Sequence, residues 1–534
     1  MTTDSPTAPK KLLGKRRSGV LLHPTSLPGP HGIGDLGPSA YHFVDWLVGA
    51  GQRAWQLLPL NPIGPGNSPY ASVSAFAGSP LMVALEPLVR EGLLPSIPQH
   101  ELAQFEGQNN YRVDFGKVIP WRMGKLRQAA GAFFARGQLD EYRAWVEKAG
   151  YWLEDYALFM ALDAHYQQDA GAWARAKAAG VDYVDWTRWP DALARREDEA
   201  LAAARREHAG ELEFWRFVQF CFDRQWAALR RYANERDVVL IGDMPIFVAH
   251  HGADCWSRPD LYQLDEGFQP RVVAGVPPDF FSKTGQRWGN PLYDWKAMAG
   301  EGFAWWSDRM RRQLELADRV RVDHFRGFAG YWEIPAEAET AMSGRWVPGP
   351  GAPLFQAMKG ALGELPVIAE DLGVITPDVE ALRDGLGFPG MKILQFAFSD
   401  PSEAAADHPF LPHNYSCNCV VYTGTHDNDT ARGWLAGASA RERAFALNVL
   451  DCREDNFHWG MVHAALSSVA ELAVVQMQDA LGLGGEHRMN VPGQTECWTW
   501  RFVWDMVGGE PAWRLRRWAA AYGRVGIGKL ELPG

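Results

Sequence analysis

The sequence predicts an α/β fold, a (β/α)8 TIM barrel with inserted, largely helical subdomains and no C-terminal β-sandwich. Three observations lead to this prediction. Eight short runs rich in Val, Ile and Leu alternate with helical stretches, several of these runs end in acidic residues, and little sequence follows the last run. Near-continuous apolar runs are typical of parallel strands that are buried on both faces. In a barrel of such strands, the chemistry lies on the loops that follow their carboxyl ends.

The eight candidate strands are spread along the whole chain. They are residues 19–23, 54–60, 237–243, 317–323, 365–371, 391–398, 418–427 and 471–479. The last segment also fits a helix, because Glu471, Leu472, Val475 and Gln478 follow a 3.6-residue period. The strand count of eight therefore depends on this segment.

About 175 residues separate the second candidate strand from the third. A single crossover between parallel strands needs only a helix and two loops, so we expect a mainly helical insertion at about 75–235. In this insertion Phe214, Phe217, Val218 and Cys221 are spaced at i, i+3, i+4 and i+7. This spacing predicts a helix with one apolar side packed in a core.

Charge and targeting signals narrow the class of protein. The net charge of the 534 residues is −11, so no overall basic field favours nucleic acid as a partner. Residues 1–17 are predicted to be a flexible tail before the barrel of residues 18–534. No signal-peptide core or membrane-spanning run is apparent, which leads us to expect a cytoplasmic protein without a membrane partner. No obligate protein partner is indicated. A cleaved transit peptide remains an alternative.

Cysteine and histidine spacing does not indicate a metal site. The six cysteines form no CxxC pair, and buried free thiols are the simpler interpretation. His250, His251 and Asp254 are an alternative ligand group, but adjacent side chains point apart on a strand or helix. We therefore expect no metal and no cofactor.

The motif GIGDLG, residues 32–37, matches the glycine fingerprint of dinucleotide-binding proteins. Its context differs, because three prolines separate it from the preceding apolar run. Leu57 and Leu58 stand where an acidic ribose ligand is expected. The motif is therefore predicted to be a rigid glycine loop.

The segment 317–323 places charged and apolar residues on opposite faces of a strand. Arg321 and Asp323 point to one face, whereas Val320 and Val322 point to the other. In a barrel the valines would face the helices and the charged pair would face the mouth. A guanidinium beside a carboxylate favours its ionised form, so Asp323 is a candidate nucleophile.

Two further strand ends carry acids. Glu370 follows one run, and in an apolar setting near another carboxylate it would hold the proton that a leaving oxygen needs. His426 and Asp427 follow the run at 418–427 and would bind sugar hydroxyls. Two carboxyl groups with separated pKa values are what a glycosidase uses. The 24 tryptophans of the chain suit stacking on sugars as well as core packing.

Four motifs together resemble one family of enzymes. They are IGDMPIFVAHHGADCW (241–256), RVDHF (321–325), VIAEDLG (367–373) and GTHDNDT (424–430). From about residue 18 onwards, the chain resembles the 4-α-glucanotransferases of the amylomaltase or disproportionating-enzyme type, glycoside hydrolases allied to the α-amylases. The resemblance implies transfer of α-1,4-glucan segments, from maltooligosaccharides or from starch or glycogen chains, to the 4-OH of an acceptor glucan or glucose.

The resemblance also implies roles for individual residues. Asp323 would form a covalent glycosyl intermediate, Glu370 would be the acid/base, and Asp427 would bind hydroxyls of the distorted sugar. The residues that it implies for substrate binding are Tyr70, Asp243, Asp279, Trp288, Asn290, Arg321 and His426.

The segment 274–295 is predicted to be a lid-like loop, because it is rich in Pro, Gly and aromatic residues. A lid that excludes water favours transfer over hydrolysis. An ordinary loop with its aromatic rings packed beneath it is the alternative. Two other functions remain open: a retaining α-glucan hydrolase with the same acids, and a sugar-binding protein without catalysis.

Overall fold

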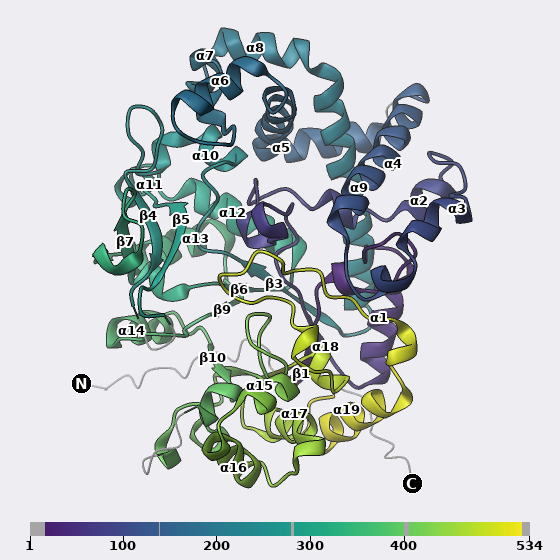
Figure 1. Ribbon diagram of the computed structural model, residues 1–534, viewed down its shortest axis with the longest axis vertical. Coiled ribbons are helices and arrows are strands. Elements are labelled where there is room, and N and C mark those ends of the chain that lie inside the picture. The colour runs from purple at the N-terminus through teal and green to yellow at the C-terminus, as the bar shows by residue number, and fades with distance from the viewer. Residues whose placement is uncertain (1–15, 138, 279–281, 400–404, 526–534) are drawn as a thin grey trace, which may run out of the picture.

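Eight parallel strands form the centre of the computed structural model (Figure 1), which describes residues 16–137, 139–278, 282–399 and 405–525. Most of the predicted tail, 1–17, lies outside these residues. The strands are β1 (Arg17–Leu21), β2 (Ala54–Gln56), β3 (Val239–Met244), β6 (Arg319–Val322), β9 (Val367–Ala369), β10 (Gly390–Ile393), β11 (Cys419–Tyr422) and β12 (Leu472–Gln476).

The strands follow one another around a barrel. Their order is β10-β11-β12-β1-β2-β3-β6-β9, and the two end strands meet where the Ala369 amide donates to the Pro389 carbonyl at 2.9 Å. All eight candidate strands are confirmed, and the last is a strand that leads into helix α18 (Met477–Ala480). The prediction was wrong for residues 394–398, which form a 3-10 turn after β10.

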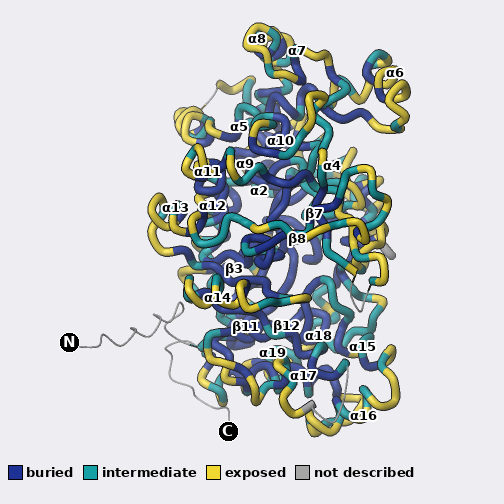
Figure 2. Tube along the Cα trace, turned by 90° about the vertical axis from the view of Figure 1, so that its left-hand side faces the viewer, coloured by how far each residue is buried: buried dark blue, intermediate teal, exposed yellow. Residues whose placement is uncertain are grey.

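Helices cover the outside of the barrel, as the apolar strands require. Val320 and Val322 of β6 are buried in the main core, as their alternation with Arg321 predicted. Figure 2 shows buried strands at the centre and exposed turns on the outer helices. These outer helices are α1 (Pro38–Gly49), α9 (Ala209–Asn234), α12 (Ala304–Leu316), α13 (Ala352–Leu362), α14 (Pro377–Gly385), α15 (Ala431–Gly437), α16 (Ala440–Val449), α17 (Phe457–Ser467) and α19 (Gly509–Ala521).

The segment between β2 and β3 is mainly helical, as expected from its length. It contains α2 (Leu85–Arg90), α3 (Gln99–Leu102), α4 (Phe115–Ala135), α5 (Asp140–Tyr166), α6 (Ala170–Ala178), α7 (Asp191–Ala194) and α8 (Asp198–Glu207), and it ends with α9. The predicted apolar side of α9, from Phe214 to Cys221, is buried. The division of the chain into a barrel and an inserted unit stays a prediction.

A second, antiparallel sheet lies beside the barrel, with the order β5-β4-β7-β8. Its strands are β4 (Val272–Val276), β5 (Gln286–Pro291), β7 (Gly330–Pro335) and β8 (Arg345–Pro348). The segment 274–295, predicted to be a loop, therefore contains the end of β4 and all of β5, with a connection between these two paired strands. The apolar run at Val272–Ala274 supplies a strand that pairs with both β5 and β7.

Two short helices flank this sheet in sequence, α10 (Ala253–Ser257) and α11 (Trp295–Gly300). Trp295, which could have stacked on sugar, packs instead against Tyr293 and Trp306. After β12, residues 477–525 contain helices and turns but no sheet strand. In the described part of the chain, no helix has both the length and the apolar character that a bilayer crossing requires.

Candidate active site

The carboxyl ends of β3 and β6 place three charged residues in one ion-pair network. Strand register sets Asp243 directly opposite Arg321. One guanidinium nitrogen of Arg321 donates to both oxygens of Asp243, at 2.8 and 2.7 Å, and the other donates to Asp323 at 2.8 Å. The Asp243 side chain has no exposed surface, whereas that of Asp323 is 30% exposed. Of the two acids, Asp323 is therefore the one that a bound molecule can reach.

Burial and charge act in opposite directions in this network. Burial tends to lower the pKa of Arg321, but the carboxylates of Asp243 and Asp323 raise it well above its usual value. Burial also raises the pKa of Asp243, and Arg321 opposes that shift. Arg321 is thus a permanent cation that fixes the direction of the Asp323 carboxylate.

Glu370 lies beside Asp323 because β6 and β9 are neighbours in register. Its two carboxyl oxygens accept backbone hydrogen bonds from His324, at 2.7 Å, and from Leu372, at 3.1 Å. Burial and the nearby negative charge of Asp323 nevertheless raise the pKa of Glu370 to about 8. This shift has the direction that an acid needs in order to hold its proton near neutral pH, and the role of Glu370 as the acid/base stays a prediction.

His324 has an unusual backbone that serves Glu370. Its φ of 51° and ψ of 48° lie in the left-handed region, which costs energy for a residue with a side chain and is common at functional sites. This conformation accompanies the backbone hydrogen bond to Glu370. Burial lowers the pKa of the His324 ring to about 4, and the ring meets Trp288 edge to face at 4.9 Å.

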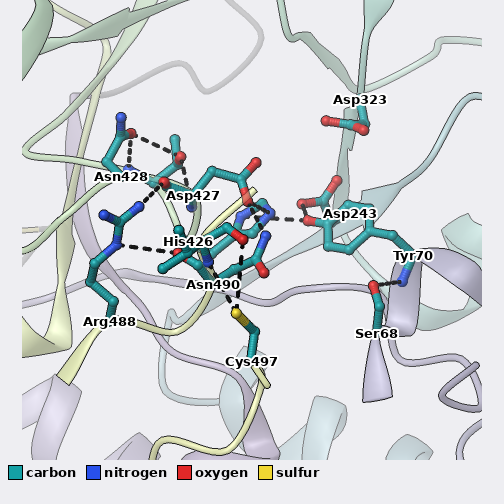
Figure 3. A network of polar contacts seen from close by, with 12 residues as sticks. Ser68, Tyr70, Asp243, Asp323, His426, Asp427, Asn428, Arg488, Asn490 and Cys497 are labelled. Atoms are coloured by element: carbon teal, nitrogen blue, oxygen red, sulfur yellow. Dashed lines mark hydrogen bonds and ion pairs between the residues drawn. The ribbon is translucent and has the colours of Figure 1, made fainter. Parts of the chain in front are cut away.

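Asp427 enters the site from the loop after β11 and is held by a different set of contacts (Figure 3). Asn490 donates to its carboxylate at 2.6 Å, and Arg488 donates to its main-chain carbonyl at 2.8 Å. His426 Nε2 lies 3.3 Å from the same carboxylate, which is 44% exposed. The backbone N–H of Asn490 also donates to the carbonyl of His426 at 3.1 Å.

Tyr70 connects the Asp427 loop with the Arg321 network. Its hydroxyl donates to Asp243 at 2.7 Å and lies 3.5 Å from Nδ1 of His426. The Tyr70 ring stacks on the His426 ring with centroids 4.9 Å apart and an interplanar angle of 17°. Figure 3 shows Tyr70 between Asp243 and His426.

Most residues expected at the site therefore lie in one network. This network contains Tyr70, Asp243, Arg321, Asp323, Glu370, His426 and Asp427, and Trp288 adjoins it through His324. Asn290 directs its amide to the Val248 carbonyl at 2.9 Å, and Asp279 lies outside the described residues.

Three further residues at the site were not predicted from the sequence: Arg488 and Asn490, and Trp498, whose ring packs against those of Tyr70 and His426. They belong to the segment after β12, the strand whose assignment was open. Loops that follow barrel strands line the carboxyl-end face. A firm assignment of β12 would therefore have directed attention to this segment.

The candidate metal ligands near β3 have separate protein partners. His250 contacts the Phe268 carbonyl at 2.8 Å, and His251 contacts Asp163 at 3.1 Å. Asp254 accepts from the Ala75 amide at 2.7 Å. These three residues therefore help to hold neighbouring segments together.

Within the described ranges, a different group of side chains is the one whose ligand atoms lie close enough together for a metal ion. Atoms of His31, Asp35 and Glu86 lie within 4.8 Å of one another. The Arg122 guanidinium already donates to Asp35 at 3.0 Å and supplies positive charge where an ion would bind. We therefore interpret the group as a buried ion-pair network.

The glycines of GIGDLG are required by close packing. Gly32 has a φ of +75°, and a Cβ there would lie 2.5 Å from the Phe105 ring. At Gly34 a Cβ would lie 2.0 Å from the Pro24 carbonyl oxygen. Both positions therefore exclude a side chain for packing reasons alone.

Comparisons with known proteins agree with this geometry. A family model described as 4-alpha-glucanotransferase matches residues 22–505. The 4-alpha-glucanotransferase of Thermus thermophilus is 47% identical over 526 residues, which cover 96% of this chain and 99% of the relative. The chloroplastic/amyloplastic 4-alpha-glucanotransferase of Solanum tuberosum is 43% identical, with 96% of this chain and 87% of the relative covered.

Solved structures give the same result. The amylomaltase from Streptococcus agalactiae in complex with acarbose superimposes with a TM-score of 0.88 at 35% identity, covering 96% of this chain and all of the other. The amylomaltase from Corynebacterium glutamicum shares the fold, with a TM-score of 0.74 at 19% identity, covering 96% of this chain and 76% of the other.

Proposed function

The chain belongs to the 4-alpha-glucanotransferase family, and from this premise we propose that it transfers α-1,4-glucan segments by a retaining double displacement through Asp323. The donor is a maltooligosaccharide or a starch or glycogen chain, and the acceptor is the 4-OH of another glucan or of glucose. The observation that carries the proposal is that Glu370, buried and with a raised pKa, lies beside the partly exposed Asp323, which Arg321 holds.

In the first step, Asp323 attacks the anomeric carbon of the donor and the glycosidic bond breaks. Glu370 gives its proton to the departing 4-oxygen, so that the leaving chain departs as a neutral alcohol. The product is a glycosyl ester on Asp323. A carboxyl group with a pKa of about 8 suits this step, because it is protonated at neutral pH.

In the second step, the 4-OH of the acceptor attacks the same carbon from the side that the leaving chain vacated. Glu370, now ionised, accepts the proton of this hydroxyl, and Asp323 departs as a carboxylate. Two inversions at one carbon retain the α configuration. The starting protonation state of the enzyme is restored.

Asp427 and the residues around it bind the sugar in this scheme. Its exposed carboxylate accepts hydrogen bonds from two hydroxyls of the sugar at the cleavage point, and His426 supports it. Charge-assisted hydrogen bonds of this kind are about twice as strong as neutral ones. Tyr70 and Trp288 present aromatic faces, whereas Asp243 acts through Arg321 and Tyr70 because it is fully buried.

Transfer rather than hydrolysis requires that an acceptor sugar reach the ester before water does. The sheet β5-β4-β7-β8 supports this arrangement, because it carries the half-exposed Trp288 against His324, next to Asp323. A contribution of Asp279, Asn290 or a moving lid stays a prediction, as does the cytoplasmic location.

The proposal is tested by incubating the protein with maltotriose alone, resolving products by chain length and counting reducing ends. Glycosyl transfer produces longer maltooligosaccharides and glucose at a constant number of reducing ends. A rising number of reducing ends with only shorter sugars would identify water as the acceptor and support a hydrolase. Binding of maltotriose without any product would support a sugar-binding protein.

The covalent step has its own test. Rapid denaturation of the Glu370→Gln variant during turnover of an α-glucosyl fluoride should trap a glycosyl ester, because fluoride departs without an acid. Peptide mass spectrometry should locate the adduct on Asp323. An adduct on another residue would contradict this mechanism. So would the absence of any adduct while the variant turns over the substrate with retention of the α configuration.

A further inference from the structure

The segment from Arg488 to Trp498 folds back on itself against the active site. The Trp498 amide donates to the Met489 carbonyl at 2.8 Å, and the Val491 amide donates to the sulfur of Cys497 at 3.3 Å. One side of this hairpin carries Asn490, which binds Asp427. Its other side ends at Trp498.

Trp498 has a backbone conformation that is unfavourable for its side chain. Its φ is +67°, in the left-handed region that bulky residues rarely adopt. Such strain persists only where the surrounding structure enforces it, and it is concentrated at functional sites. The packing around the hairpin therefore holds Trp498 in this conformation.

The Trp498 ring lies against the stacked rings of Tyr70 and His426. The Trp498 indole lies 5.5 Å from the Tyr70 ring and 5.6 Å from the His426 ring, tilted by 37° to each. Since Tyr70 and His426 also contact each other, the three rings form a closed aromatic cluster. Trp498 is 6% exposed, so its contacts are on the inner side of the site.

The Tyr70 hydroxyl donates a hydrogen bond to Asp243. Asp243 in turn accepts from one terminal nitrogen of the Arg321 guanidinium, and the other terminal nitrogen donates to Asp323. A displacement of Tyr70 would therefore reach the Asp323 carboxylate through three hydrogen-bonded links, Tyr70–Asp243, Asp243–Arg321 and Arg321–Asp323. We propose that Trp498 is a positioning residue, whose ring holds Tyr70 and His426 and thereby fixes Asp323 and Asp427. The inference rests on the proposed roles of these two acids.

The test separates the ring of Trp498 from its backbone with three substitutions. Trp498→Phe keeps a ring, Trp498→Ala removes it, and Trp498→Gly removes it and also relieves the left-handed strain. We expect kcat/KM for maltotriose to fall on the order of 100-fold in the Ala and Gly variants, because the reacting group is misplaced. The Phe variant should keep most of the activity, and the Gly variant should melt at a higher temperature than the Ala variant.

Phe303 provides a matched control for stability. It is also a buried aromatic residue with a positive φ, at 7% exposure and φ = 57°, but it begins helix α12. Phe303→Ala should lower the melting temperature as Trp498→Ala does, while kcat/KM stays at the wild-type value at temperatures where both variants are folded.

A double-mutant cycle gives the deciding readout. When Tyr70→Ala has already removed one of the two rings that Trp498 holds, Trp498→Ala should lower kcat/KM by clearly less than it does in the wild type, because only the contact with His426 is left to lose. The inference is overturned if activity follows melting temperature across the Ala, Gly and Phe variants, if Trp498→Ala is as active as wild type, or if the two effects are additive. Failure of the proposed function is distinguishable, because Asp323→Asn would then retain activity whatever Trp498 does.

Discussion

The two sides of the active site are built in different ways. On one side, Asp323 and Glu370 come directly from the ends of neighbouring strands β6 and β9 and are largely surrounded by protein. On the other side, Asp427 extends from a loop, is 44% exposed, and is held by Asn490 and Arg488 from a segment about 60 residues later in the chain.

This difference shows which physical factor controls each acid. Strand register fixes the neighbours of Glu370, and burial beside Asp323 then sets its pKa. The direction of Asp427 depends instead on hydrogen bonds between loops. Changes to the strand side should therefore act on the chemical step and its pH dependence, whereas changes to the loop side should act on sugar binding and geometry.

The largest expected effect is on the strand side. Asp323→Asn removes the nucleophile but keeps the size of the side chain, so kcat for maltotriose disproportionation should fall about 10⁴-fold or more. Asp45→Asn is the control, because Asp45 forms an exposed ion pair with Arg236 and should leave kcat unchanged. A residual rate within tenfold of wild type in the Asp323 variant would contradict the strand-side assignment.

On the loop side, Asp427→Asn should lower kcat/KM by about 10²- to 10³-fold, the usual effect of losing one preorganised electrostatic contact. Asn490→Ala should cost less, about 10- to 100-fold, because it removes one hydrogen bond to a carboxylate. In the Asp427→Asn background, Asn490→Ala should add little. Full additivity of the two substitutions would show that Asn490 does not act through Asp427.

The pH dependence distinguishes the two sides more sharply. Because Glu370 must be protonated to assist departure of the leaving chain, kcat/KM should fall as pH rises through about 8, the pKa of Glu370. The Asn490→Ala substitution should lower kcat/KM at every pH without moving the midpoint of its pH dependence. A midpoint displaced by a full pH unit in that variant would mean that the two sides are electrostatically coupled.

The smallest effect is on stability, and its sign follows from the same pKa. Glu370 has a pKa of about 8 in the folded protein, against about 4.5 for an ordinary glutamate, so the folded protein binds this proton more tightly than the unfolded chain does. Stability is therefore lost as pH rises from 4.5 towards 8. The Glu370→Gln variant has no carboxyl group at this position and therefore does not lose stability in this way. The difference between its melting temperature and that of the wild type should become more positive by about 1–3 °C from pH 5 to pH 8.

Asp371→Asn is the matched control for this measurement. Asp371 is also buried, but it pairs with Arg383 and accepts the Met391 amide at 2.7 Å. Its substitution should lower the melting temperature throughout the range, because Arg383 loses its buried partner and keeps only the exposed Asp384. If the melting-temperature difference between Glu370→Gln and wild type did not vary with pH, the proposed link between protonation of Glu370 and folding stability would be wrong.

The sequence alone was enough to predict the barrel, because eight apolar runs of strand length must each be buried on both faces. It also placed Arg321 and Asp323 on the inner face of one strand, since side chains alternate with a period of two. The motifs around Asp323, Glu370 and Asp427 also indicated the family.

Other features depend on contacts between segments far apart in the chain. The pairing of β4 with β7 turned an apparent loop into a sheet, and the pKa of Glu370 required burial beside Asp323. Asn490, Arg488 and Trp498 reach the site only because the segment after β12 folds over the loop after β11. Local sequence determines which residues can form strands and carry charge, whereas long-range packing decides which of them meet, because hydrogen bonds and desolvation depend on distance in space.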